Sequence, residues 1–185
     1  MERPISNRTI YNPLQKDAVT FLNISSETNG TYTLVEVELA DKGGVGLHYH
    51  KTYAETFTCL EGKVQIQVND KLLTLTEGQS ATASPWSNHL FQNRSGASCR
   101  FQVKITPANR GFEETLQIAY GLARDGKCGK NGIPRNPLVL AWLFVHSESN
   151  LKGWRSIFEP LLKLQAKLAV ILRMDKKLIR QYVTF

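Results

Sequence analysis

The run KVQIQVNDKLLTLT, residues 63–76, constrains the fold more than any other part of this sequence. Val64, Ile66 and Val68 alternate with glutamines, which is the period of a β-strand that buries one face. The Asn-Asp pair that follows is a turn signal, and KLLTLT supplies a returning strand. The run therefore predicts an antiparallel hairpin whose apolar face belongs to the core of a sandwich or barrel.

Similar short runs, rich in β-branched and aromatic residues, occupy the first two thirds of the chain. Glycine and Asn/Asp turns separate them at regular spacing, which is typical of a β-sandwich or β-barrel. The other predicted strands are AVTFLNI, TYTLVEVELA, LHYH, ETFTCL, ATAS, HLFQN and CRFQVKI. We therefore expect a mainly β fold.

The apolar period becomes helical after Ala108. In GFEETLQIAYGLARDG, four apolar residues recur at helical spacing: Phe112, Leu116, Ala119 and Leu122. This segment predicts a helix that ends near Gly126. LVLAWLFV and WRSIFEPLLKLQAKLAVILR predict two more helices, and Pro160 should bend or delay the second.

The change of period predicts a β-barrel over residues 1–110 and a helical extension over residues 111–185. Within the chain, the loop Asn131–Pro137 is the favoured boundary between the barrel and a helical appendage. A chain of 185 residues fits one structural domain, so we expect the helices to pack on the barrel or at a dimer interface.

The formal net charge is +7 with a pI near 9.4, and it is unevenly placed. From residue 151 onward, eight Lys and Arg residues face only Glu159 and Asp175; eight minus two leaves +6 in this segment. The segment has no aromatic–basic interleaving and no zinc-finger spacing. We therefore expect no nucleic-acid partner.

Cys59, Cys99 and Cys128 are widely spaced and form no C-x-x-C pair, which argues against a disulfide framework. Cys59 and Cys99 lie in strand-like runs and should be small buried hydrophobes. The first residues lack the apolar core of a signal peptide, and the longest apolar runs are too short to cross a bilayer. These features predict a reducing, cytoplasmic setting.

Two of the four histidines lie in the run GLHYHKTYAE, on either side of a tyrosine. Residues two apart on a strand point the same way, so His48 and His50 should share a face while Tyr49 points away. If ETFTCL pairs back against LHYH, Glu55 reaches the same pocket. Two imidazoles and a carboxylate are suitable ligands for a divalent transition metal.

Two histidines remain as candidates for a fourth ligand. His89 opens HLFQN, a strand-like run within the predicted barrel. His146 ends LAWLFVH in the helical part, where the helix dipole favours a histidine. His89 is therefore the better candidate.

The stretch HYHKTYAETFTCLEG resembles the first motif of the cupin superfamily, G(X)5HXH(X)3–4E(X)6G. Four positions fit its spacing: His48, His50, Glu55 and Gly62. The leading glycine is displaced, because the motif requires it at Lys42 and this chain has Gly43 and Gly44.

The stretch GQSATASPWSNHLFQN resembles the second cupin motif, G(X)5PXG(X)2H(X)3N. Three positions are in register: Gly78, His89 and Asn93. Ser84 stands where the motif has proline, and Trp86 stands where it has glycine; Pro85 partly keeps the turn chemistry. The whole chain also resembles a group of small single-domain bacterial cupins that carry ARDGK, IP and an apolar helical tail, a group without a well-defined activity.

The resemblance implies a cupin-type antiparallel β-barrel, or jelly roll, with C-terminal α-helices. It implies one divalent transition metal (Fe, Mn, Ni or Zn) with one or two positions open to water or substrate. The implied ligands are His48, His50, Glu55 and His89, and Glu55 is also a candidate general base. The alternative is that these four side chains line the barrel of a cupin that has no metal.

Two functions fit this interpretation. One is a mononuclear metal-binding cupin that acts on a small organic molecule, with a dioxygenase-like, oxygen-dependent oxidation as the first hypothesis. The other is a non-catalytic barrel that binds or senses a small molecule. Phe57 and Phe91 should line the pocket, and Trp86 should either stack on a ligand at its mouth or pack the turn.

The tail from Trp154 to Leu172 is dense in apolar residues, with Lys163 and Lys167 on the opposite face. We expect it to cover the barrel or to form the interface of a homodimer. A basic amphipathic helix on an anionic membrane surface is the less favoured hypothesis, because the apolar arc is wide enough to need a protein partner.

Overall fold

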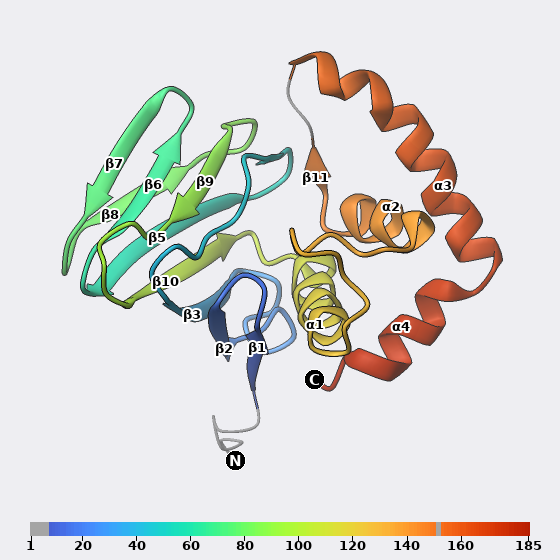
Figure 1. The fold of residues 1–185 in the computed structure, drawn as a ribbon, viewed down its shortest axis with the longest axis horizontal. Helices are drawn as coiled ribbons and strands as arrows, with labels where there is room; N and C mark the ends of the chain where they lie inside the picture. Colours follow the sequence, from blue (N-terminus) through green and yellow to red (C-terminus); the bar gives the residue numbers. More distant parts are fainter. Residues whose placement is uncertain (1–7, 151–152) are drawn as a thin grey trace.

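The computed structural model describes residues 8–150 and 153–185, without the side chains of 153–155. Strands occupy the left of Figure 1 and helices the right. The first seven residues of the predicted barrel segment, and the side chain of Trp154 in the predicted tail, lie outside the described part.

Two antiparallel sheets face each other. The larger one contains, in spatial order, β1 (Thr9–Asn12), β2 (Asp17–Asn23), β3 (Thr33–Leu39), β10 (Cys99–Thr106), β5 (Ala54–Glu61) and β8 (Ser80–Ala83). The smaller one contains β7 (Lys71–Leu75), β6 (Val64–Val68) and β9 (His89–Gln92). Every strand run predicted from the sequence overlaps one of these strands or the short β4 (Tyr49–His50).

The predicted hairpin is confirmed. Strand β6 pairs antiparallel with β7, with Val68 opposite Lys71. Asn69 adopts φ +53°, a left-handed conformation that asparagine tolerates in tight hairpin turns. Val64 and Ile66 are buried, as their alternation predicted.

The mainly β architecture with C-terminal helices is confirmed, but the described residues do not form a closed barrel. The small sheet continues beyond β9 only as two isolated pairs, Gly44 with Gln92 and His48 with His89. The segment DKGGVG has no regular strand, because glycine is a poor strand residue. A Cβ on Gly44 would lie 2.5 Å from the carbonyl oxygen of Phe91, so glycine is needed for this close approach.

Four α-helices follow: α1 (Arg110–Arg124), α2 (Pro137–His146), α3 (Glu159–Ile171) and α4 (Met174–Tyr182). A 3-10 helix, η2 (Gly153–Phe158), precedes α3, and Pro160 lies in the first turn of α3, so proline delays this helix as expected. The helix α4 was not predicted as a separate element. It starts after Arg173, whose φ of +56° ends the preceding helical segment.

The helix α1 separates two hydrophobic cores. Its residues Phe112, Leu116 and Tyr120 pack on the core between the sheets. Ile118 and Leu122, on its other side, belong to a second core formed with α2, α3 and α4. No helix formed by residues 8–150 and 153–185 combines the length and apolar character that a membrane span requires.

Candidate metal centre

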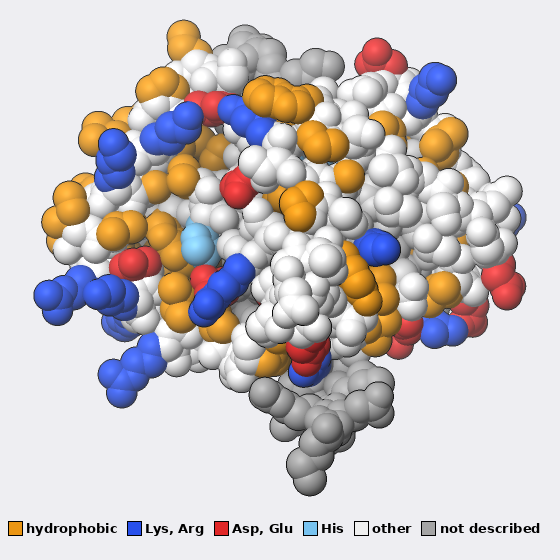
Figure 2. Space-filling view, turned by 180° about the vertical axis from the view of Figure 1, so that it is seen from behind, with side chains coloured by type: hydrophobic (Ala, Val, Ile, Leu, Met, Phe, Trp, Pro, Cys, Tyr) orange, Lys and Arg blue, Asp and Glu red, His pale blue; other side chains and the backbone are white. Residues whose placement is uncertain are grey.

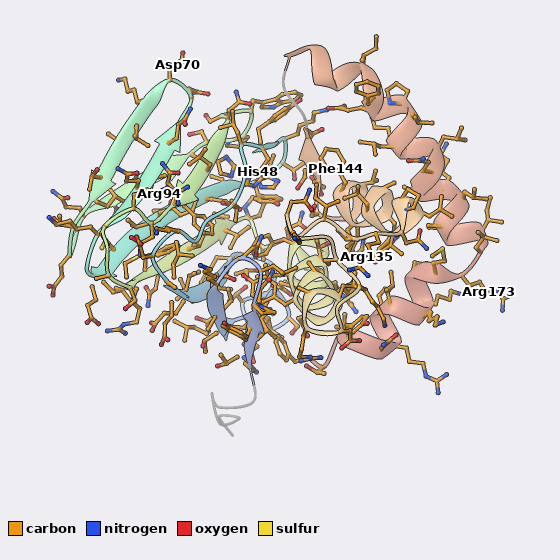
Figure 3. All side chains as sticks on the ribbon, in the orientation of Figure 1. His48, Asp70, Arg94, Arg135, Phe144 and Arg173 are labelled. Carbon is orange, nitrogen blue, oxygen red and sulfur yellow. The ribbon has the colours of Figure 1, made fainter. Side chains whose placement is uncertain are left out.

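Strand pairing brings His48 and His89 together. Their backbones exchange two hydrogen bonds, with His48 N 3.1 Å from His89 O and His89 N 2.8 Å from His48 O. Their rings lie 4.4 Å apart. Figure 3 shows His48 between the strands on the left and the helices on the right.

His50 lies on the same side of its strand as His48, as the two-residue period predicted. Its ring is 4.8 Å from that of His48 and 5.3 Å from that of His89. One nitrogen from each of the three rings lies within 4.8 Å of the others, an arrangement that could hold a metal ion.

Glu55 reaches the histidines by a different route from the one expected. The predicted pairing of LHYH with ETFTCL is wrong: β4 pairs with β11 (Ser149–Asn150), and β5 pairs with β8 and β10. Glu55 therefore approaches from the opposite sheet. Its carboxylate oxygens lie 3.5 Å from His50 Nε2 and 3.2 Å from His89 Nε2.

Backbone carbonyls orient the three rings. The Nδ1 atoms of His48, His50 and His89 lie 2.9, 3.4 and 3.0 Å from the carbonyl oxygens of Gly46, Glu148 and Ser87. A carbonyl can only accept, so each Nδ1 carries a proton, and a ring that is neutral then has its lone pair on Nε2. The Nε2 atoms of His50 and His89 are buried and have no hydrogen-bond partner among residues 8–150 and 156–185. Metal-binding histidines commonly show this arrangement.

Burial and mutual charge adjust the ionisation of the four groups. Burial lowers the pKa of His48, and it lowers that of His50 to about 4. Burial also lowers the pKa of His89, but attraction to Glu55 outweighs it and raises the value. Burial raises the pKa of Glu55, and the three histidines more than reverse this, to about 2. His48 and His50 are therefore neutral at pH 7, and Glu55 is ionised.

A cavity of about 200 Å³ opens beside these side chains. His48, His50 and Glu55 form one end of it. The apolar residues that line the rest come from the sheets and from α1: Val19, Val35, Val37, Val45, Phe91, Val103, Phe112, Leu116 and Ala119. The buried Thr115 Oγ1 at its wall has no hydrogen-bond partner among the described residues. The cavity suits a small, mainly apolar molecule.

The aromatic residues expected around the pocket occupy different places. Phe91 lines the cavity. Phe57 is fully buried, with its ring 6.2 Å from that of His89, and it packs in the core rather than at the cavity wall. Trp86 is 63% exposed and stacks on Tyr49, with ring centroids 5.9 Å apart. Tyr49 thus points away from the histidines, as its strand position predicted.

Trp86 keeps the backbone of the glycine that it replaces in the motif. Its φ is +69°, in the left-handed region that a bulky side chain rarely adopts. Its N–H donates a 2.7 Å hydrogen bond to the carbonyl of His50. This bond ties the turn to the strand that carries two of the candidate ligands.

Sequence reasoning missed the contribution of residues 147–150. Ser149 and Asn150 pair with His50 and Tyr49, and the Tyr53 hydroxyl donates a 2.9 Å hydrogen bond to Ser147 O. The Tyr53 ring also stacks on His50 at 4.2 Å. A strand of two residues, Ser149–Asn150, is too short to show an alternating pattern, so the local sequence did not predict this contact.

His146 ends α2, as expected, and takes no part in the histidine cluster. Its Nε2 lies 2.7 Å from a carboxylate oxygen of Glu114, and its ring stacks on Trp142 at 4.5 Å. Cys59 and Cys99 are buried free thiols, as predicted.

Comparisons with known proteins agree on the fold. A family model of the cupin domain matches residues 35–105. Among solved structures, KdgF from Halomonas sp. is 10% identical with a TM-score of 0.50, over 57% of this chain and 91% of that chain. A predicted oxalate decarboxylase from Thermotoga maritima is 19% identical with a TM-score of 0.49, over 58% of this chain and 99% of that chain. The polyketide cyclase RemF from Streptomyces resistomycificus is 18% identical with a TM-score of 0.48, over 57% and 79%.

Similarities at these identities concern the fold and leave the reaction open. No curated protein matches this chain. The matched segment runs from within β3 to within β10 and includes His48, His50, Glu55 and His89. Residues 35–105 therefore match the cupin domain, and this part of the chain has the cupin fold.

Proposed function

We propose that His48, His50, Glu55 and His89 bind one divalent transition metal, and that the protein binds or acts on a small, mainly apolar organic molecule in the adjoining cavity. The observation that carries the proposal is the pair of buried Nε2 atoms, on His50 and His89, without hydrogen-bond partners. A buried unsatisfied nitrogen is costly, and a metal ion would satisfy it.

The candidate ligands are of the kind that bind first-row transition metals. Three imidazole nitrogens and one carboxylate suit Fe, Mn, Ni or Zn. A metal held by this set supplies Lewis-acid chemistry and, when it is redox-active, oxidation with O2. We propose oxygen-dependent oxidation as the first reaction class to test, ahead of isomerisation or hydrolysis.

The chain's own groups have defined roles in this proposal. The backbone carbonyls behind the histidines orient the rings and hold the proton of each neutral ring on Nδ1. Glu55 serves as a ligand or accepts a proton from substrate, since it is ionised at neutral pH. The apolar residues Phe112, Leu116 and Ala119 of α1 form one wall of the cavity and would contact the apolar part of the bound molecule.

Elemental analysis tests the metal. Untagged protein purified without chelator should contain about one equivalent of a transition metal, and a His48→Ala/His89→Ala variant should contain none. His146→Ala is the matched control, because this histidine lies outside the cluster, and it should retain the metal. A folded wild type that takes up no metal, even after reconstitution, would overturn the metal proposal and leave a ligand-binding barrel.

A test for substrate turnover distinguishes the two proposed functions, an enzyme and a non-catalytic ligand-binding protein. If the bound metal is iron, oxygen consumption with candidate small molecules is the direct assay; zinc or nickel calls for hydrolase and isomerase screens. Ligand binding that shifts the thermal midpoint without any turnover supports the sensing alternative. A cytoplasmic location and a homodimer stay predictions, and light scattering on purified protein tests the second.

A further inference from the structure

The outer side of α3 carries an uncovered apolar stripe. It consists of Leu161, Leu164, Leu168 and Ile171 of α3, together with Ile157 of the preceding 3-10 helix η2, each between 44% and 75% exposed, and we call it the outer stripe. On the inner side of α3, Ala166 and Ala169 are buried in the second core with residues of α2. Leu162 packs against the same core, whereas Leu161, Leu164 and Leu168 of α3 remain exposed.

Basic side chains surround the outer stripe. The exposed ones from α3 to the end of α4 are Lys163, Lys167, Arg173, Lys176, Lys177 and Arg180. Over residues 156–182 the acidic residues are Glu159 and Asp175, so six minus two gives +4. Figure 2 shows hydrophobic and basic side chains interspersed along the left edge, where α3 and α4 lie.

A basic groove of about 590 Å³ continues from the end of the outer stripe. Leu172, at that end, is itself exposed and lines the groove. The other lining residues include Arg135 from the loop before α2, Arg173 from the turn between α3 and α4, and Lys177 from α4 (Figure 3 labels the two arginines). None of these three forms an ion pair with a described residue. The described residues that line the groove include no acidic one.

Two observations decide which partner covers this surface. The outer stripe has the 3.5-residue spacing of a coiled-coil seam, but it spans about two heptads, and stable coiled coils need about three to four. In a dimer formed through this surface, two segments that each carry a net charge of +4 would face each other, and their repulsion opposes association. An anionic lipid surface attracts the same charges and accepts the apolar side chains.

We propose that α3 and α4 dock on an anionic membrane surface. The outer stripe enters the boundary between head groups and acyl chains, with α3 lying in the plane of the surface. The basic groove takes the phosphate of a lipid head group between Arg135 and Arg173. This docking is independent of the metal and of any reaction in the cupin domain.

Vesicle co-sedimentation of the full chain tests the stripe. Wild type should bind vesicles of equal parts phosphatidylglycerol and phosphatidylcholine, should bind pure phosphatidylcholine far less, and should be released by high salt. Leu164→Glu/Leu168→Glu should bind at least about 100-fold more weakly, because two buried leucines become charged. Leu72→Glu/Leu73→Glu on β7 is the matched control, also at exposed leucines, and should bind as wild type does.

A second variant tests the groove. Arg135→Gln/Arg173→Gln/Lys177→Gln should lower affinity for the anionic vesicles about 100-fold, at roughly 1 kcal/mol per cation. Circular dichroism should show unchanged helix content in every variant, since all substituted side chains are exposed. Equal binding to both vesicle types, or a wild-type dimer that the Leu164→Glu/Leu168→Glu variant splits and that ignores vesicles, would overturn the proposal.

Discussion

Helices α1 and α3 are similar in length, 15 and 13 residues, and opposite in burial. Helix α1 has eight buried residues and contributes to both cores, whereas α3 buries two alanines. The apolar content of α3 is nevertheless the higher, as its leucines and isoleucines show. Helix α1 lies between the sheets and the other helices, whereas α3 lies at the surface. The location of a helix in the fold, and not its apolar content, therefore determines how much of it is buried.

Polar contacts reinforce the contrast. Glu113 of α1 is buried, yet it accepts hydrogen bonds from the backbone N–H and the hydroxyl of Ser25, at 2.6 and 2.9 Å, and from the Thr33 hydroxyl. Glu114 is also buried and pairs with Arg110 and His146. Buried charges are tolerated when they are paired in this way. Helix α1 is thus attached to the sheets and to α2 by side-chain bonds as well as by packing.

The largest expected effect tests the contrast directly. Ile118→Ala on α1 should lower the free energy of unfolding by about 2 to 5 kcal/mol, because the side chain is fully buried and its removal leaves a cavity. Leu164→Ala on α3, where the leucine is 65% exposed, should change it by less than about 0.5 kcal/mol. Urea unfolding followed by circular dichroism measures both. Similar losses in the two variants would break the comparison.

The stability gained on metal binding should depend on the histidine cluster and should not depend on the exposed side of α3. Chelated protein given the metal at 100 to 1,000 times its dissociation constant should gain about 3 to 4 kcal/mol of stability, since only the folded site binds. Leu164→Ala should keep this gain, and His48→Ala/His89→Ala should lose it. Thermal melts with and without metal provide the measurement. A gain that survives in the double histidine variant would place the metal elsewhere.

The contact between Tyr120 of α1 and Asp17 of β2 should make the free energy of unfolding depend on pH. Asp17 accepts a hydrogen bond from the buried Tyr120 hydroxyl, and burial raises the pKa of Asp17 to about 6, even though that bond opposes the shift. A carboxyl whose folded pKa is raised stabilises the fold only while protonated. Its contribution is therefore complete below about pH 4 and falls as the pH rises to about 6.

Asp17→Asn removes this charge while keeping the shape. The variant should be more stable than wild type by up to about 3 kcal/mol at pH 7.5, and the two should converge below about pH 4. Unfolding curves at several pH values check the expectation. A difference that does not vary with pH would show that Asp17 does not titrate in this range.

The smallest effect concerns an exposed aromatic side chain of the β region. Trp86→Gly should relieve about 1 kcal/mol of backbone strain and lose a similar amount from the stack on Tyr49, for a net change near zero. Trp86→Ala loses the stack without this relief and should be less stable than the glycine variant by about 1 kcal/mol. Equal stability of the two variants would contradict the strained conformation.

Much of the β region was predictable because its periods are local. The alternation in KVQIQV and CRFQVKI located two core strands, and the cupin motifs indicated His48, His50, Glu55 and His89, which the fold brings together. The pairing partners were not predictable. Glu55 was expected beside β4, but it lies in the facing sheet, because a strand's period identifies its buried face and carries no information about its neighbour.

The helical part shows the same division. The spacing in residues 110–126 predicted α1 correctly, and Pro160 delays α3 as expected. The Ser149–Asn150 contact with β4 and the break at Arg173 had no sequence signal, since two residues and one φ value are too little to form a pattern. Division of the chain at residue 110 stays a prediction.

By itself, the sequence determined the strand and helix periods, the cupin motifs and the basic charge of the last third, because these depend on residue type and spacing along the chain. Tertiary packing places Glu55 opposite the histidines, lays α1 along the cavity and leaves Leu161, Leu164 and Leu168 of α3 exposed. These outcomes depend on how layers pack. Packing is settled by contacts between residues far apart in the sequence, which no local pattern encodes.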